Sequence, residues 1–263
     1  MNSLVLCFIL FFSTASDQVT QNVAHGQINW TDKTLTVTGS GAPNLKAANA
    51  AAARLGAERA AKLDAMRNAL ETIRGLRLSG NIAASTTLDA TPELKAKVSG
   101  VIQGFKTADI KYYSDGGVDV ILTGPLDGIL SELLATNVGN NSDSATVAEP
   151  AVSSKISGII INSKGLKLTP ALTPKLVDEE GNIVYSAAQI NIDAFREHGM
   201  IEYIKNIELA KKSIRIGTKP LIIKAKALAA PKSADIIITN DDAQKIRKLS
   251  AILTQGKVVI VCD

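Results

Sequence analysis

The feature that most constrains the fold of this chain is an alanine-rich segment without proline, residues 45–74, which ends immediately before Gly75. Apolar side chains recur in it at steps of three and four, as they do in a helix with one face on a core. They are Leu45, Ala48, Ala52, Leu55, Leu63, Met66, Leu70 and Ile73. Asn44 or Pro43 suits the start of this helix, and Gly75 suits its end. At ~1.5 Å per residue the helix would be about 45 Å long and could cross an entire sheet.

Glycines beside and within this segment carry two further expectations. Gly39 and Gly41 lie between a predicted strand and the helix, and we expect Gly41 to adopt a positive φ in a sharp turn. Phosphate binding by this Gly-Ser-Gly is the alternative, but the third glycine of a dinucleotide fingerprint and any Gly-Lys-Ser/Thr are missing. Gly56 lies in the helix interior, where glycine costs roughly 1 kcal/mol relative to alanine. We therefore expect a tight crossing with another element at Gly56 rather than a bend.

Two predicted hairpins flank the helix in the sequence. Alternation in residues 28–30 and 35–37 predicts the first, with Trp30 in the core, although carbohydrate stacking on Trp30 is an alternative. Residues 105–113 and 118–123 predict the second, around an Asp-Gly turn. Between and after them we expect an extended segment at 76–88 and helices at 92–101 and 126–134. This order predicts an α+β domain, an antiparallel sheet crossed by one long alanine-rich helix.

The second half of the chain predicts a separate, smaller domain. Residues 136–154 are rich in Asn, Ser, Ala and Gly without apolar periodicity, which indicates a linker. Residues 155–263 then alternate predicted strands (156–162, 183–185, 221–227, 236–239 and 258–261) with predicted helices (200–212 and 243–253). We expect a mixed α+β domain here.

The amino terminus predicts export. An apolar run over residues 4–12 is followed by Ser-Thr-Ala, the pattern of a signal peptide cleaved after residue 15. The missing Lys or Arg before the run leaves a buried first strand as the alternative, and Leu6 before Cys7 disfavours lipidation there. No transmembrane segment is expected in the mature chain, because the run is shorter than the ~20 residues that a spanning helix needs. Cys262 would then be the single cysteine, and we expect it in the core, with a covalent dimer as the alternative.

Charge is unevenly divided. Residues 16–135 carry twelve basic and twelve acidic side chains, whereas residues 155–263 carry seventeen basic and eleven acidic ones. The surplus favours an anionic partner such as peptidoglycan. Nucleic acid is not expected as a partner, because the lysines are dispersed and aromatic residues make up only 4%.

Residues typical of catalysis or metal binding do not cluster in the sequence. The two histidines, His25 and His198, fall in opposite halves, and no Gly-x-Ser-x-Gly motif occurs. The acidic turn at residues 178–182 could attract calcium, but a solvated hairpin tip explains it better. An unfamiliar carboxylate pair such as Asp178 with Glu202 is the remaining enzymatic alternative. We predict a protein without enzymatic activity, cofactor or metal.

Motifs over residues 26–135 resemble a known envelope module. They are the turn after Trp30, the Gly39-Ser40-Gly41-Ala42-Pro43 run, Ala60-Ala61 followed by Asp64-Ala65-Met66-Arg67, and Gly75-Leu76-Arg77-Leu78. In this order they resemble the LPP-twenty lipoprotein family and the amino-terminal domain of the flagellar assembly protein T. Residues 158–185 also resemble a domain that accompanies this module.

The resemblance implies an exported bacterial protein of the periplasm or outer membrane. It implies a structural or assembly component without enzymatic activity, for example in a ring around the flagellar basal body. The expected partners are envelope or basal-body proteins and further copies of the chain. The chain lacks the lipobox of the lipoprotein members, which favours a soluble periplasmic or ring-associated form. The alternative is a periplasmic module that binds peptidoglycan or another anionic envelope ligand.

Overall fold

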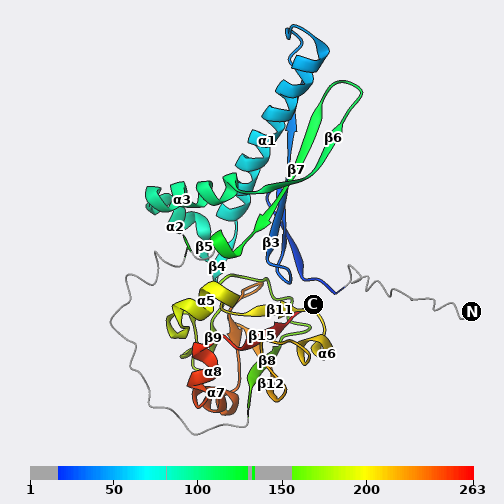
Figure 1. Cartoon of the computed structure of the whole chain (residues 1–263). Coiled ribbons are helices and arrows are strands. Elements are labelled where there is room, and N and C mark those ends of the chain that lie inside the picture. The colour runs from blue at the N-terminus through cyan, green and yellow to red at the C-terminus, as the bar shows by residue number, and fades with distance from the viewer. Residues whose placement is uncertain (1–16, 81, 130–131, 134–155) are drawn as a thin grey trace, which may run out of the picture.

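The computed structural model describes residues 17–80, 82–129, 132–133 and 156–263. The predicted α+β class is confirmed, with an antiparallel sheet packed on one long helix in the first part, and a parallel sheet, a mixed sheet and short helices in the second (Figure 1). The predicted signal peptide (1–15) and linker (136–154) lie outside the described residues.

The first part is a five-stranded antiparallel sheet in the order β1-β2-β3-β7-β6. Both predicted hairpins are present, β2 with β3 and β6 with β7. The strands are β1 (Thr20–Val23), β2 (Gly26–Asn29), β3 (Thr34–Gly41), β6 (Lys106–Tyr112) and β7 (Val118–Pro125). The other elements are α1 (Ala50–Arg74), β4 (Arg77–Ser79), β5 (Ile82–Ala83), α2 (Ala84–Ala90) and α3 (Pro92–Gln103). The predicted extended segment at 76–88 is therefore wrong beyond residue 83, and of the predicted helix at 126–134, residues 127–129 and 132–133 are helical.

Helix α1 packs on the sheet mainly through its alanines, so the predicted apolar stripe is wrong from Leu45 to Leu63, whereas Met66, Leu70 and Ile73 do pack against the core. Ala57, Ala61, Ala65 and Ala69 recur at steps of four and have no exposed surface. Leu45, Leu55 and Leu63 are 94%, 55% and 68% exposed. The physical reason lies in β3, because the two glycines of that strand leave space that only a helix face of small side chains can enter.

The approach of α1 to β3 is close at Gly39 and Gly41. A Cβ atom on Gly39 would lie 2.0 Å from the amide nitrogen of Ala65, and one on Gly41 would lie 2.0 Å from the carbonyl oxygen of Ala57. Gly41 belongs to β3 and is not among the glycines with positive φ, so the expected turn conformation is wrong. Gly56 has open space around its missing side chain, so the tight crossing lies at Gly39 and Gly41 instead.

The ends of α1 follow local hydrogen bonding. The helix begins at Ala50 rather than at residue 45, because the Asn49 side chain accepts a hydrogen bond from the Ala52 amide at 2.8 Å. It ends as expected at Gly75, which has a right-handed φ of −76° and donates to the Glu71 carbonyl.

The second part contains a four-stranded sheet in the order β11-β15-β8-β12 and another in the order β10-β9-β14-β13. Its strands are β8 (Gly158–Asn162), β9 (Leu176–Val177), β10 (Ile183–Tyr185), β11 (Glu202–Ile204), β12 (Pro220–Lys224), β13 (Ala227–Leu228), β14 (Ile236–Ile237) and β15 (Val258–Val261). Its helices are the 3-10 turn η1 (Ala187–Gln189), α5 (Ile192–His198), α6 (Ile207–Ala210), α7 (Asn240–Arg247) and α8 (Ser250–Thr254). The helix expected at 200–212 is instead strand β11 followed by the short α6, because β11 pairs in parallel with the buried β15.

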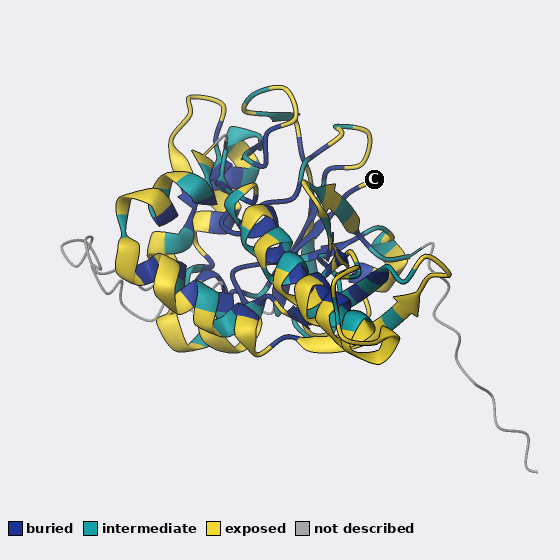
Figure 2. Cartoon of the chain, turned by 90° about the horizontal axis from the view of Figure 1, so that it is seen from above, coloured by how far each residue is buried: buried dark blue, intermediate teal, exposed yellow. Residues whose placement is uncertain are grey.

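The two parts share one hydrophobic core. The backbone of β4 bonds to the second part, where Thr173 donates its amide and its hydroxyl to the Leu78 carbonyl at 2.7 and 2.8 Å. The Asp235 carboxylate accepts from the Gly80 amide at 3.0 Å. Figure 2, seen from above, shows buried segments toward the middle of the molecule and exposed segments in its outer loops and helices.

A pair of glycine substitutions tests the close approach. Gly39→Ala should lower the free energy of unfolding by about 1–3 kcal/mol, because its Cβ atom meets the α1 backbone at 2.0 Å. Gly56→Ala, the matched control in open space, should raise it by up to ~1 kcal/mol. Urea unfolding measures both. Equal effects of the two substitutions would contradict the proposed role of Gly39.

Candidate functional site

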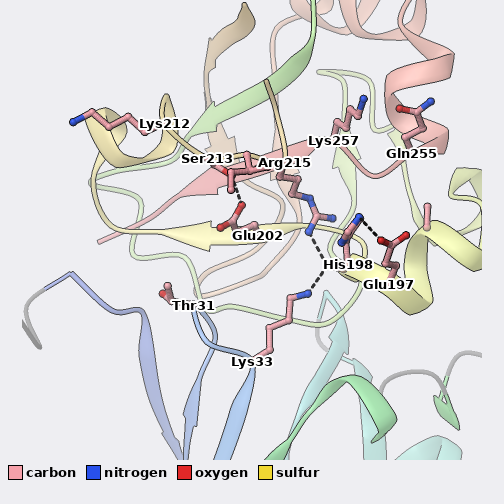
Figure 3. Close-up of a pocket in the computed structure, with 12 residues that line it drawn as sticks. Thr31, Lys33, Glu197, His198, Glu202, Lys212, Ser213, Arg215, Gln255 and Lys257 are labelled. Carbon is pink, nitrogen blue, oxygen red and sulfur yellow. Dashed lines mark hydrogen bonds and ion pairs between the residues drawn. The ribbon is translucent and has the colours of Figure 1, made fainter. Parts of the chain in front are cut away.

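A cavity of about 720 Å³ lies where the two parts meet (Figure 3). The turn between β2 and β3 forms one wall, and α5, β11 and the segments around residues 212–215 and 255–257 form the other. The lining residues are Thr31, Lys33, Ala194, Glu197, His198, Glu202, Lys212, Ser213, Ile214, Arg215, Gln255 and Lys257. Both parts therefore contribute to the lining of the cavity.

Lys33 brings the first part into this site. It lies at the tip of the β2–β3 hairpin with a φ of +51°, a left-handed conformation that a tight turn requires. Its ammonium group donates to the His198 carbonyl and lies 3.6 Å from the Asp127 carboxylate. Burial lowers the pKa of Lys33, and Asp127 partly offsets this by favouring the charged form. Lys33 thus connects the hairpin to the second part.

Arg215 holds the opposite wall together. Its guanidinium donates from Nε to the Gly256 carbonyl at 2.6 Å, from Nη1 to His198 at 2.7 Å and from Nη2 to Gly199 at 2.6 Å. Burial lowers the pKa of Arg215. Three backbone carbonyls accept hydrogen bonds from this half-buried guanidinium. Its first role is therefore to position the segments that carry those carbonyls.

The other charged side chains differ in how far they are already paired. The Ser213 hydroxyl donates to the Glu202 carboxylate at 2.7 Å, and His198 lies 3.5 Å from Glu197. Among the described residues, the ammonium groups of Lys212 and Lys257 have no hydrogen-bond or ion-pair partner. Four cationic side chains against two carboxylates leave the lining with a positive excess when His198 is neutral. Such a site suits an anionic ligand.

The residues that carry the family resemblance lie mostly away from this cavity. Asp64 on α1 accepts from the Ser40 amide at 3.0 Å and from Arg67 at 2.7 Å, and Asn68 donates to the Thr38 carbonyl at 2.8 Å. These bonds join α1 to the part of β3 that extends beyond β2. Pro43 lies beside the turn of the second hairpin, 3.2 Å from the position of a Cβ atom on Gly116. Gly39, Gly41, Asp64 and Gly75 therefore serve the packing and the end of α1.

Of the residues that carry the family resemblance, Trp30 lies next to the cavity. It is 6% exposed, and its ring meets that of Tyr203 edge to face, with centroids 5.6 Å apart. Its indole N–H donates to the Gln21 side chain at 2.9 Å. Trp30 is core as predicted, and the ring it meets belongs to the second part of the chain.

The acidic turn is not a solvated tip at its first residue. Asp178 is 3% exposed, and Arg247 donates to it at 2.8 Å, as does the Asn182 amide at 2.7 Å. The Arg247 hydrogen bond, together with those from Asn182, lowers the pKa of Asp178 to about 2. Glu202 belongs to the cavity and Asp178 does not line it, so the structure does not bring these two carboxylates into one site.

Metal and thiol chemistry find little support in the part of the chain that the structure describes. No group of three or more His, Cys, Asp or Glu side chains there could hold a metal ion. His25 lies beside Glu71 at 3.6 Å, away from His198. Cys262 is 2% exposed, as expected of a core residue, and burial raises the pKa of its thiol to about 12.

Comparison with known proteins adds one relation. Residues 158–263, from the start of β8 to the last residue, match the family model described as the second domain of Treponema pallidum Tp0624. Among curated proteins, none matches the chain. Across the described ranges, no helix has the length and apolar character needed to span a bilayer.

Sequence reasoning missed the cavity, although it considered some of its residues. It expected a tight turn around Lys33 and named Glu202, but in a pair with Asp178. The contribution of Arg215 had no local signal, because its three acceptors are backbone carbonyls 16 to 41 residues away.

The Asp178–Arg247 pair predicts a pH dependence of stability. The folded pKa of about 2 lies below the ordinary value of 3.8, so the stabilisation is present above pH ~4 and lost as the pH falls through 2. Asp178→Asn should therefore be less stable than the parent at pH 6, and the difference should shrink between pH 4 and 2. Urea unfolding at several pH values measures it. Asp193→Asn is the control, because the Asp193 side chain is 84% exposed, and a constant difference for Asp178→Asn would contradict the assignment.

Proposed function

We propose that this chain is a non-enzymatic, exported structural or assembly component of the bacterial cell envelope, for example of a ring at the flagellar basal body. The observation that carries the proposal is an arm, made of α1 and the β6–β7 hairpin, that projects away from the second part (Figure 1). The arm displays large apolar side chains, as a protein-binding surface does.

The apolar residues of the arm lie on the outward side of α1. Leu55 precedes the buried Ala57 by two residues, and Leu63 follows the buried Ala61 by two, which is about 200° around a helix in each case. Their side chains are thus directed away from the sheet. Tyr112 and Tyr113, at the far end of the hairpin, are 51% and 47% exposed.

A fixed joint between the two parts suits such a role. The shared core, the backbone bonds of β4 and the contacts of Lys33 hold the arm in one orientation relative to the second part. A protein that sets the spacing of its neighbours needs that property. The resemblance to the LPP-twenty family and to the flagellar assembly protein supports the envelope setting, since its motif residues have packing roles here.

If the arm is a docking surface, replacing its exposed leucines by charged residues should abolish the binding of partners. Leu55→Glu with Leu63→Glu should leave the free energy of unfolding within ~0.5 kcal/mol, because both side chains are exposed. In a strain that lacks the parent gene, this double variant should fail to restore swimming or flagellation, counted by electron microscopy, and should lose its cross-links to envelope proteins. Ile183→Glu, at a 50% exposed position of the second part, is the control.

Two results would contradict the proposal. Normal swimming of the deletion strain would remove the flagellar setting, and unchanged cross-links of the double variant would remove the arm as the docking surface.

Binding of an anionic envelope ligand in the cavity is the second candidate function. The positive excess of the lining favours it, as do the ammonium groups of Lys212 and Lys257, which have no partner among the residues that the structure describes. Peptidoglycan fragments carry free carboxylates, which such groups attract.

The cavity predicts salt-sensitive binding. The affinity for soluble peptidoglycan fragments should fall as salt rises, because exposed charges are screened within a Debye length of ~8–10 Å. Lys212→Gln with Lys257→Gln should weaken binding about tenfold by calorimetry. Lys224→Gln, an exposed lysine of β12 outside the cavity, should bind like the parent. Equal affinity of all three proteins would exclude this site.

A further inference from the structure

Strand β6 forms one edge of the first sheet and has β7 as its strand partner. Six of its seven residues are exposed and the seventh, Ile110, is partly buried. Figure 1 places β6 on the outer side of the projecting arm. A strand in this position presents a row of backbone groups with which another chain can pair.

The pairing of the sheet identifies which groups of β6 point outward. Alternate residues of a strand direct their backbone groups to opposite edges. Even-numbered residues of β3 pair toward β2 and α1, since Asp64 and Asn68 bind the Ser40 amide and the Thr38 carbonyl. Odd-numbered residues of β3 therefore direct their backbone groups to β7. Following the register from β3 to β7 and from β7 to β6 shows that Asp109 and Lys111 also direct their backbone groups to β7.

Ile110 and Tyr112 consequently direct their backbone groups away from the sheet. The Ile110 amide agrees with this, because its acceptor at 2.9 Å is the side chain of the neighbouring Asp109 and not β7. This local bond is one that a partner strand can replace.

We propose that β6 pairs antiparallel with β6 of a second copy of this chain, with Ile110 opposite Ile110 at the two-fold axis. This inference rests on the proposed function, because it uses the same arm. It identifies the partner of the arm as a second copy of the chain. It joins two five-stranded sheets into one continuous sheet.

Among the registers centred on Asp109, Ile110 and Lys111, the charges of β6 select the one centred on Ile110. In an antiparallel pair, an outward-facing residue of one copy lies opposite an outward-facing residue of the other. Because the outward-facing residues of β6 are even-numbered, the two residue numbers of any such pair add up to an even number. One possible register therefore differs from the next by two in this sum. With Ile110 at the axis, Asp109 of each copy lies opposite Lys111 of the other, giving two oppositely charged pairs. Centring the pairing on Asp109 would oppose two carboxylates, and centring it on Lys111 would oppose two ammonium groups.

The shapes also allow the pairing. The bulge between Thr107 and Asp109 confines the regular part of β6 to Asp109–Tyr112, and Tyr112 would lie beside the small Ala108 of the other copy. The two-fold axis places both α1 helices on one face. With each α1 above β3 and β7, they would be separated by about four strand spacings, roughly 19 Å, beyond the 8–10 Å of helix contact. A short paired segment predicts a weak, concentration-dependent dimer.

Charge reversal in the purified chain tests the register. Sedimentation velocity should record a doubling of mass as the concentration of the parent rises. Asp109→Lys or Lys111→Asp alone should weaken dimerisation about tenfold or more, because both pairs become like-charged. Combining the two substitutions in one chain, or mixing the two single variants, should restore the dimer, since each ammonium group again meets a carboxylate. Restoration is a result that a merely structural role of either residue does not produce.

A proline substitution tests the edge itself. Ile110→Pro removes an outward amide, so the monomer should keep its fold by circular dichroism while dimerisation is lost. Hydrogen exchange of the Tyr112 amide should slow as the parent dimerises. A parent that stays monomeric at all concentrations, or a dimer that survives both Ile110→Pro and the single charge reversals, would overturn the proposal. Cross-links to envelope proteins that persist in a monomeric chain would leave the proposed function standing without this interface.

Discussion

Helix α1 lies so close to β3 that one added carbon atom at Gly39 or Gly41 would overlap its backbone. This contact determines much of the first part. It requires glycines on one strand face and alanines on one helix face, and it directs Leu55 and Leu63 outward. Close packing of small side chains gives many contacts but little apolar area per residue. Leu55 and Leu63 are thereby left for contacts outside the fold.

Polar side chains complete the join between helix and sheet. Residues 38–41 of β3 extend beyond β2, and in the part of the chain that the structure describes no other strand pairs with them on that side. Asp64 and Asn68 supply the missing hydrogen bonds. This edge is therefore occupied by the chain's own side chains, whereas β6, at the opposite edge, is exposed. The difference between the two edges explains why association is proposed at one of them.

The joint between the two parts creates the cavity and fixes the arm. Trp30, Thr31 and Lys33 on the β2–β3 turn all contact the second part, while β4 and Asp235 bond across the same boundary. A hairpin that seals a shared core also forms one wall of the cationic cavity. Assembly through the arm and binding in the cavity are thus compatible proposals for the same folded chain.

The sequence by itself determined the α+β class, both hairpins, the end of α1 at Gly75 and the buried Trp30 and Cys262, because these depend on local patterns of turns and apolar residues. Only the tertiary structure decided which face of α1 is buried, since β3 excludes leucine where its glycines lie. It also decided that residues 202–204 form a strand, because β15 offers a buried partner. The cavity was likewise decided by the tertiary structure, because its walls come from residues that are far apart in the chain and meet only in the folded protein.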